Sequence, residues 1–105
     1  MIHVIHNAAH NVGKIYWNDH ALLRMRQREI KIREVIEVTG IGNVIEEYHE
    51  DKPFPSVLIS GRCSSGRALH VVVGVNSILG EIYIITCYEP EPSRWDENFS
   101  KRRKK

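Results

Sequence analysis

The organisation of this chain can be read outward from residues 19–30, DHALLRMRQREI. An α-helix turns once every 3.6 residues, so His20, Arg24 and Arg28 fall one turn apart and form a polar stripe. The apolar residues beside that stripe are Ala21, Leu22 and Met25. A helix of this kind docks by its apolar side and presents an imidazole and two guanidiniums, a combination suited to phosphate chemistry. The alternative is an ordinary surface helix with solvated charges.

The composition is that of one ordinary globular domain. The chain has 105 residues, of which 42% are hydrophobic and 27% charged, which allows one core and not two. It has no apolar run long enough for a membrane span and no signal-peptide core, so we expect a cytoplasmic protein without membrane partners. The net charge is +2, but residues 101–105 are all basic, and without them acidic side chains outnumber basic ones. This distribution predicts a local anion site rather than a broad surface that coats nucleic acid.

The cysteines and the amino-terminal histidines carry weak signals. Cys63 and Cys87 form no CxxC pair, so we expect reduced thiols without a catalytic role. His3, His6 and His10 would align on one helix face, which makes a metal site conceivable. No carboxylate or cysteine lies close to them in the sequence, and terminal segments are often loose, so we predict no metal there.

Hydrophobic periodicity predicts a strand, two helices and then a small sheet of four further strands, an α+β domain. The predicted elements are a strand at 14–17, helices at 19–28 and 33–38, an edge strand at 44–50, strands at 56–60, 67–75 and 81–88, and a helical turn at 93–99. Gly40 and Gly42 are expected to end the second helix. We therefore divide the chain into an extension at 1–13, one domain at 14–100 and a mobile basic tail at 101–105.

His70 interrupts the apolar strand predicted at 67–75. A buried histidine costs free energy unless its nitrogens find hydrogen-bond partners. One interpretation is a core histidine bonded to a backbone carbonyl or a tyrosine, and the other is a site histidine that transfers protons near neutral pH. Thr86 and Tyr88 share one face of the next strand and are candidate partners. His70 and the stripe on the first helix converge only if that helix covers the same face of the sheet.

Three motifs together resemble a known family of small bacterial proteins. They read HAxxRMxxRxI over residues 20–30, RxLHV over 67–71 and IITxYEP over 84–90. The pattern is similar to domain-of-unknown-function family four-two-five-eight, and the resemblance covers about residues 14–103, including Trp95 and the Arg102-Arg103 pair. The sequence departs from the pattern at Glu29, where glycine is frequent, and the first thirteen residues lie outside it.

The resemblance implies a β-α-α-β-β-β-β fold with two helices packed on a small antiparallel sheet, like that of the RelE and MqsR ribonuclease toxins. Genes of this family often lie beside one for a small zinc-finger antitoxin, which the resemblance makes a predicted partner. It also implies that motif positions are occupied by His20, Arg24, Arg28, His70, Thr86 and Tyr88.

We therefore expect a metal-independent endoribonuclease that needs no cofactor and cleaves RNA by attack of the 2′-hydroxyl. The predicted catalytic residues are His20, His70, Arg24, Arg28 and Tyr88, and the predicted substrate-binding residues are Arg67, Thr86, Lys101, Arg102 and Arg103. A histidine would transfer the proton, arginines would stabilise phosphate charge, and Tyr88 would stack on a base or donate a proton. The basic tail would add salt-sensitive attraction to RNA.

Two alternatives remain open from the sequence. The first is a non-catalytic module whose edge strand at 44–50 accepts a strand of a protein partner, with the stripe on the first helix recognising acidic groups. The second is a degenerate toxin-like protein that keeps the fold and has lost turnover. A fold alone does not distinguish them, because function depends on the site.

Overall fold

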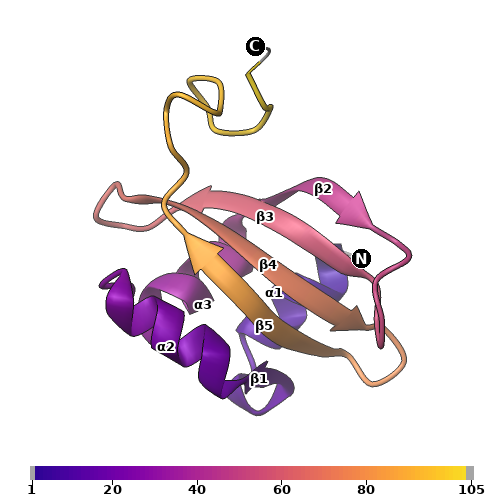
Figure 1. The fold of residues 1–105 in the computed structure, drawn as a ribbon. Helices are drawn as coiled ribbons and strands as arrows, with labels where there is room; N and C mark the ends of the chain where they lie inside the picture. The colour runs from indigo at the N-terminus through magenta and orange to yellow at the C-terminus, as the bar shows by residue number, and fades with distance from the viewer. Residues whose placement is uncertain (1, 104–105) are drawn as a thin grey trace.

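Five strands form one sheet in the computed structural model, which describes residues 2–103 (Figure 1). The strands, in the order β1-β5-β4-β3-β2 across the sheet, are β1 (Ile15–Trp17), β5 (Glu81–Tyr88), β4 (Ala68–Asn76), β3 (Ser56–Arg62) and β2 (Asn43–Tyr48). The helices are α1 (Ile2–Ala9), α2 (Asp19–Gln27) and α3 (Ile32–Ile41), with a 3-10 turn, η1 (Val12–Lys14), before β1. The predicted α+β class is confirmed.

The sheet is mixed rather than wholly antiparallel. Strands β2 to β5 are antiparallel neighbours as expected, but β1 pairs with β5 in parallel. The β1–β5 pairing ends where Trp17 meets Ile84. Beyond that point no described strand lies beside this edge of β5, and the Cys87 carbonyl there accepts a hydrogen bond from Arg28, just after α2.

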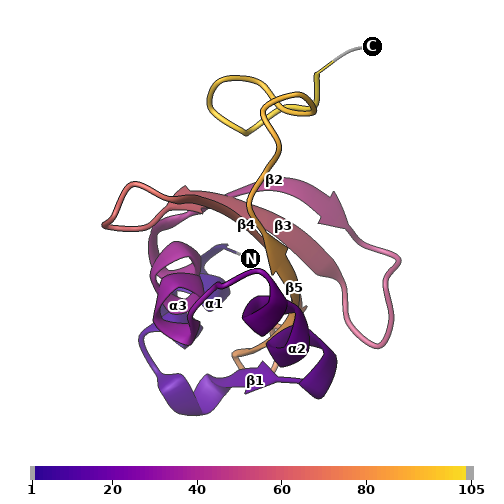
Figure 2. The ribbon, with the colours of Figure 1, turned by 60° about the vertical axis from the view of Figure 1, so that its left-hand side comes forward.

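All three helices lie on one face of the sheet, and the chain after β5 lies beyond the opposite face (Figure 2). Strand alternation separates the two sides. In β4, Leu69, Val71 and Val73 are buried in the core beneath the helices, whereas His70 points to the opposite face, which we call the outer face. None of the helices in residues 2–103 is long and apolar enough to cross a membrane.

Helix α1 is part of the core and not a loose extension. Ile5 and Ala8 are buried in the same hydrophobic cluster as the sheet. His6 donates its Nε2 hydrogen to the carbonyl of Gly42 at 3.0 Å, and His10 Nδ1 lies 2.7 Å from the carbonyl of His6. His6 and His10 therefore each use a ring nitrogen in a contact with a backbone carbonyl. No group of three side chains that could bind a metal ion is found among the described residues.

Helix α2 forms as predicted and has well-defined ends. The Asn18 side chain caps its amino end by accepting the amide hydrogen of Ala21 at 2.6 Å. At the other end Glu29 adopts the left-handed conformation, with φ of 55°. The amide of Ile30 donates to the Met25 carbonyl at 2.8 Å and that of Glu29 to Arg26 at 3.2 Å, which is a Schellman motif.

Helix α3 is longer than predicted because Gly40 lies inside it. The chain turns at Gly42, whose amide donates to the Val38 carbonyl at 2.7 Å. A Cβ on Gly42 would lie 2.6 Å from Ile59 Cγ2, so this helix end packs directly on β3. Gly61, which lies outside the strand predicted at 56–60, belongs to β3 and lies in the same close contact with Gly42.

The segment after β5, residues 90–103, differs most from expectation. We call it the C-terminal segment. It contains no helix but folds back on itself, because Trp95 and Arg102 form a β-bridge and the Arg103 amide donates to the Arg94 carbonyl at 2.8 Å. Lys101, Arg102 and Arg103 thus belong to this folded-back turn, while residues 104 and 105 lie outside the described residues.

Candidate functional site

The main candidate site is a pocket of about 480 Å³ where the end of β5 meets the C-terminal segment. Its lining comes from three parts of the chain, namely the end of α2, the end of β5 and the C-terminal segment. The lining residues are Arg28, Tyr88, Glu89, Glu91, Arg94, Trp95 and Arg102. Three guanidiniums and a phenol hydroxyl thus share one concave surface.

Arg28 reaches the pocket because the edge of β5 is open. Its Nη1 donates to the carbonyl of Cys87 at 2.7 Å and to Thr86 Oγ1 at 3.3 Å. That carbonyl is accessible because β1 ends opposite Ile84. The guanidinium is anchored on one side and exposed on the other, and no described carboxylate forms an ion pair with it. Arg28, Thr86 and Tyr88, all predicted from the sequence, are therefore brought together.

Tyr88 rests on His70, its direct neighbour across β4 and β5. His70 is 0% exposed. Its Nε2 lies 2.7 Å from the Phe99 carbonyl, which can only accept, so this nitrogen carries the hydrogen. In the neutral ring Nδ1 is then an acceptor, and the Tyr88 hydroxyl, 3.3 Å away, donates to it. The core interpretation of His70, with a carbonyl and a tyrosine as partners, describes this arrangement.

Burial keeps both members of this pair neutral near pH 7. It lowers the pKa of His70 from its ordinary value of 6.5, and it raises the pKa of the Tyr88 hydroxyl above 10. No buried side-chain nitrogen or oxygen in the described residues lacks a hydrogen-bond partner. His70 has no exposed surface, so it acts on the pocket only through the neighbours that line it, Tyr88 and Trp95.

The C-terminal segment supplies the opposite wall of the pocket. Trp95 packs edge-on against the His70 ring at 4.4 Å between centroids, and the Arg102 guanidinium lies 4.7 Å from the Trp95 ring centroid. Arg102 also donates to both carboxylate oxygens of Glu46 in β2, at 2.8 and 3.1 Å, and these bonds lower the pKa of Glu46. The sequence analysis missed Glu46 and Arg94, while Trp95 belongs to the quoted resemblance.

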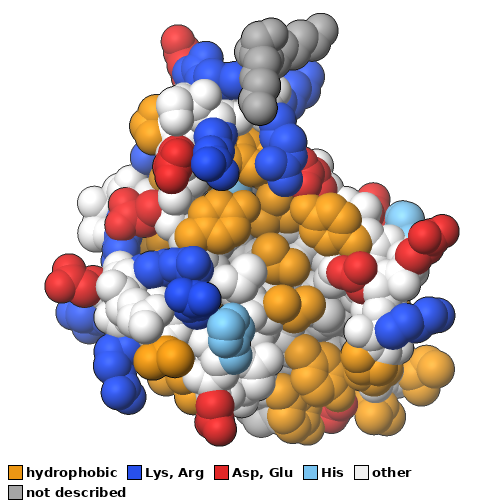
Figure 3. Space-filling model, viewed as in Figure 1, with side chains coloured by type: hydrophobic (Ala, Val, Ile, Leu, Met, Phe, Trp, Pro, Cys, Tyr) orange, Lys and Arg blue, Asp and Glu red, His pale blue; other side chains and the backbone are white. Residues whose placement is uncertain are grey.

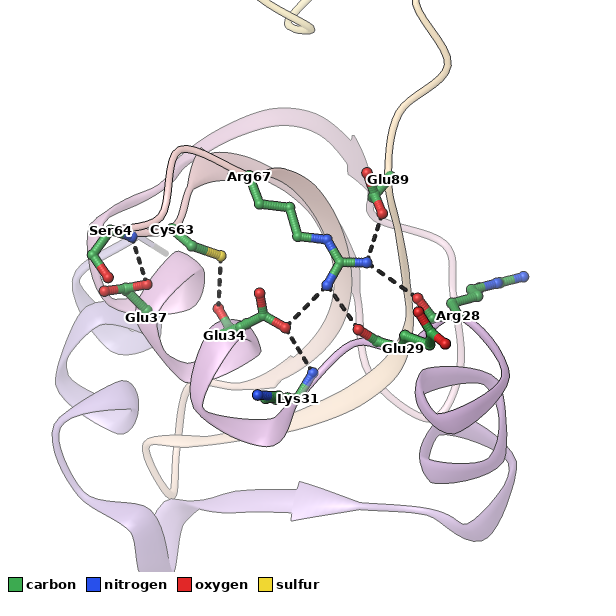
Figure 4. A network of polar contacts seen from close by, with 9 residues as sticks. All are labelled: Arg28, Glu29, Lys31, Glu34, Glu37, Cys63, Ser64, Arg67 and Glu89. Carbon is green, nitrogen blue, oxygen red and sulfur yellow. Dashed lines mark hydrogen bonds and ion pairs between the residues drawn. The ribbon is translucent and has the colours of Figure 1, made fainter.

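Arg67 was predicted to bind phosphate but does not line the pocket. It takes part in a network of polar contacts instead (Figure 4). Its Nη1 donates to the Glu29 carbonyl at 2.8 Å and to Glu34 at 3.1 Å, and its Nη2 donates to the Arg28 carbonyl at 3.1 Å and to Glu89 at 2.6 Å. This guanidinium therefore ties the end of α2 to α3 and to the end of β5. It positions Arg28 through the backbone of the helix end and offers no free fork for a phosphate.

His20 and Arg24 lie on the exposed side of α2, outside the pocket lining. His20 precedes Arg28 by two helical turns, roughly 12 Å along the axis. Because α2 covers the core face of the sheet and His70 lies on the outer face, the two predicted histidines do not converge. Arg103 donates from Nε to the Pro92 carbonyl at 2.7 Å, and neither it nor Lys101 lines the pocket.

The two cysteine thiols can be assigned structural roles. Both thiols are buried, and burial raises the pKa of Cys63 and raises that of Cys87 to about 11. Neither is a thiolate at neutral pH, in agreement with the expectation that they are not catalytic.

The carboxylates in the pocket are partly neutralised, since Glu89 pairs with Arg67 and Glu91 lies 3.4 Å from Arg94.

The chain is thus an α+β protein with a mixed five-stranded sheet, in which Arg28, just after α2, contacts the end of β5. The model of the family described as Domain of unknown function (DUF4258) matches residues 17–89, and the chain belongs to this family. Searches of curated proteins and of solved structures found no match. The matched region includes Arg28, His70 and Tyr88, and it ends before the C-terminal segment that completes the pocket.

Proposed function

We propose that this protein is a metal-independent endoribonuclease, the toxin of a toxin–antitoxin pair, and that it acts at this pocket. The observation that carries the proposal is that Arg28, Arg94 and Arg102 line the same pocket as Tyr88, whose hydroxyl is backed by a neutral histidine. Arginine clusters bind phosphate by paired hydrogen bonds. Because the proposed substrate is cellular RNA, we expect the protein to act in the cytoplasm. The family resemblance makes a small zinc-finger antitoxin the expected protein partner.

The chemistry follows from the direction of the Tyr88–His70 hydrogen bond. Tyr88 takes the proton of an RNA 2′-hydroxyl as it passes its own proton to His70 Nδ1. The 2′-oxygen attacks the adjacent phosphorus, and the 5′-oxygen leaves with a proton from water in the open pocket. The products are a 2′,3′-cyclic phosphate and a free 5′-hydroxyl. Arg28 and its neighbouring guanidiniums stabilise the charge of the phosphorane.

In this proposal the remaining predicted residues orient Arg28 or attract the RNA strand. Thr86 orients Arg28 by accepting its hydrogen bond. His20 and Arg24 lie on the exposed side of the same helix and attract the RNA strand flanking the pocket. Lys101 and Arg103 add sequence-independent attraction that salt weakens.

The test is cleavage of a defined single-stranded RNA by purified protein in the presence of a chelator. Tyr88→Phe removes the relay hydroxyl and should lower the cleavage rate by at least about a hundredfold. Arg28→Gln should lower it similarly, and Arg26→Gln, on the same helix but outside the pocket, is the matched control. Cyclic phosphate ends support the mechanism. Absence of cleavage by the wild type, with and without ribosomes, would contradict the proposal.

A second candidate function is a protein-binding module. The observation that favours it is that β2 forms an open edge of the sheet among the described residues. Such an edge can pair with a strand from a partner. A stable complex with a protein partner, together with the absence of RNA cleavage, would support this function instead.

A further inference from the structure

Three aromatic rings form a row on the outer face, away from the pocket. Tyr16 of β1 stacks on Tyr83 of β5 at 5.1 Å between centroids, and Phe54 stacks on the other side of Tyr83 at 5.2 Å. The planes are nearly parallel, at 20° and 11°. Tyr16, at one end of this aromatic row, is 43% exposed. Its outward ring face is therefore available to a further flat ring.

The tyrosine hydroxyls of the aromatic row form hydrogen bonds at the ring edges and leave the ring faces free for stacking. The hydroxyls of Tyr16 and Tyr83 both donate to the Glu81 carboxylate, at 2.8 and 3.2 Å. The bond to Glu81 raises the pKa of Tyr16, so its ring is a neutral phenol at physiological pH. Cross-strand aromatic pairs are common in sheets and account for Tyr16 and Tyr83, which are partners in β1 and β5. That role leaves the half-buried Phe54 ring of the row unexplained.

The row is joined to the pocket by an apolar band on the outer face. Ile85 is 39% exposed and Val72 is half-buried, and both lie between the row and Tyr88. Figure 3 shows hydrophobic side chains down the middle of this face, with Lys and Arg gathered on the side where α2 lies in Figure 1. Arg28, which donates to Thr86 and to the Cys87 carbonyl at the edge of β5, thus borders the band with positive charge.

We propose that the aromatic row is a base-stacking subsite for single-stranded RNA that extends from the pocket, an inference that rests on the proposed function. Bases stack on exposed aromatic rings while cations follow the phosphates, a combination typical of single-strand binding surfaces. Tyr83 and Tyr88 are five residues apart on β5, roughly 17 Å. This distance corresponds to at most about five stacked nucleotides at ~3.4 Å each.

The positive border favours RNA over a protein as the occupant of this face. An apolar protein surface would need no cations along one side, whereas an RNA strand with its bases on the row brings phosphates toward α2. The subsite recognises the flat faces of bases and so takes any sequence. It determines the minimum length of the substrate instead.

The experiment measures binding of 2′-O-methyl oligouridines, which cannot be cleaved, with lengths of two and six nucleotides. Wild-type protein should bind the hexamer more tightly than the dimer. Tyr16→Leu keeps an apolar side chain but removes the ring, and it should weaken hexamer binding at least about fivefold while leaving dimer binding unchanged. Tyr16→Phe keeps the ring and should bind the hexamer as the wild type does. Ile41→Ser, an exposed change on the helical side, is the matched control.

The outcomes separate the subsite from the pocket. If Arg28→Gln weakens both oligomers but Tyr16→Leu binds the hexamer normally, the subsite is wrong and the proposed function stands. If the wild type binds neither oligomer, both proposals fail. If Tyr16→Leu leaves RNA binding intact but releases a protein partner, the face binds protein and the subsite is overturned. Thermal unfolding of each variant checks that the comparison is made on folded protein.

Discussion

His70 should make the stability of this protein depend on pH in a way that a single substitution removes. The native state holds a neutral imidazole, because burial lowers the His70 pKa below the ordinary value of 6.5. The unfolded chain therefore binds more protons than the native state as pH falls below 6.5. The free energy of unfolding then decreases with falling pH until the folded-state pKa is reached. The slope from this one group is at most about 1.4 kcal/mol per pH unit.

The substitution His70→Gln removes the titrating group. At pH 7.5 it should cost about 1–3 kcal/mol, since two hydrogen bonds are lost or weakened, although the Phe99 carbonyl keeps the Ser60 hydroxyl, 3.2 Å away, as a donor. The measurement is urea unfolding of wild type and variant between pH 7.5 and 5. The difference in unfolding free energy should shrink as pH falls.

The matched control is His49→Gln, because the His49 side chain is 69% exposed and lies 3.4 Å from the exposed Glu47 carboxylate. This variant should keep the wild-type slope, which also reflects carboxylates and other histidines. A difference between wild type and His70→Gln that stays constant from pH 7.5 to 5 would refute the reasoning. It would mean that the imidazole is equally easy to protonate in the folded and unfolded chains.

Three further substitutions test how the site is supported. Glu29→Gly removes the strain of a left-handed backbone conformation at the end of α2. It should raise the unfolding free energy by about 0.5–1 kcal/mol, seen as a rise in Tm of a few degrees. Glu29→Ala removes the charge but keeps the strain, so it should give no such rise. Gly42→Ala places a methyl group 2.6 Å from Ile59 Cγ2 and should lower the free energy of unfolding by about 1–3 kcal/mol in urea. An unchanged value would mean that the end of α3 is free to move away from β3. Arg67→Gln removes the tie between α2, α3 and β5 and should cost about 1–2 kcal/mol, since Glu89 is too exposed to add much; an unchanged urea midpoint would contradict the importance of this network.

The sequence analysis succeeded where the signal was local. The stripe on α2 lies within one helix, and the alternation in β4 and β5 is a period of two that burial on one face imposes. The same alternation correctly made Tyr88 a candidate neighbour of His70. The two interpretations of His70 could not be separated from the sequence, because they depend on whether anything covers the outer face.

The differences between expectation and structure have a common physical cause, which is contact between distant parts of the chain. Residues 101–105 were predicted to be a basic tail, yet Arg102 pairs with Glu46, 56 residues away. Arg67 was predicted to bind substrate, yet its carboxylate partners come from α3 and the end of β5. Residues 1–13 were predicted to be an extension, yet α1 carries Ile5 into the core.

The pocket combines two parts of the chain that differ in their relation to the family. The matched region supplies the anchored Arg28 and the Tyr88–His70 pair, whereas Arg94, Trp95 and Arg102 come from residues beyond the match. The C-terminal segment also buries His70, and this burial lowers the imidazole pKa. The segment therefore contributes both positive charge to the pocket and the neutral state of the histidine behind Tyr88. If the proposed relay operates, its pH dependence should be controlled by how tightly this segment covers the outer face, and not by the family core alone.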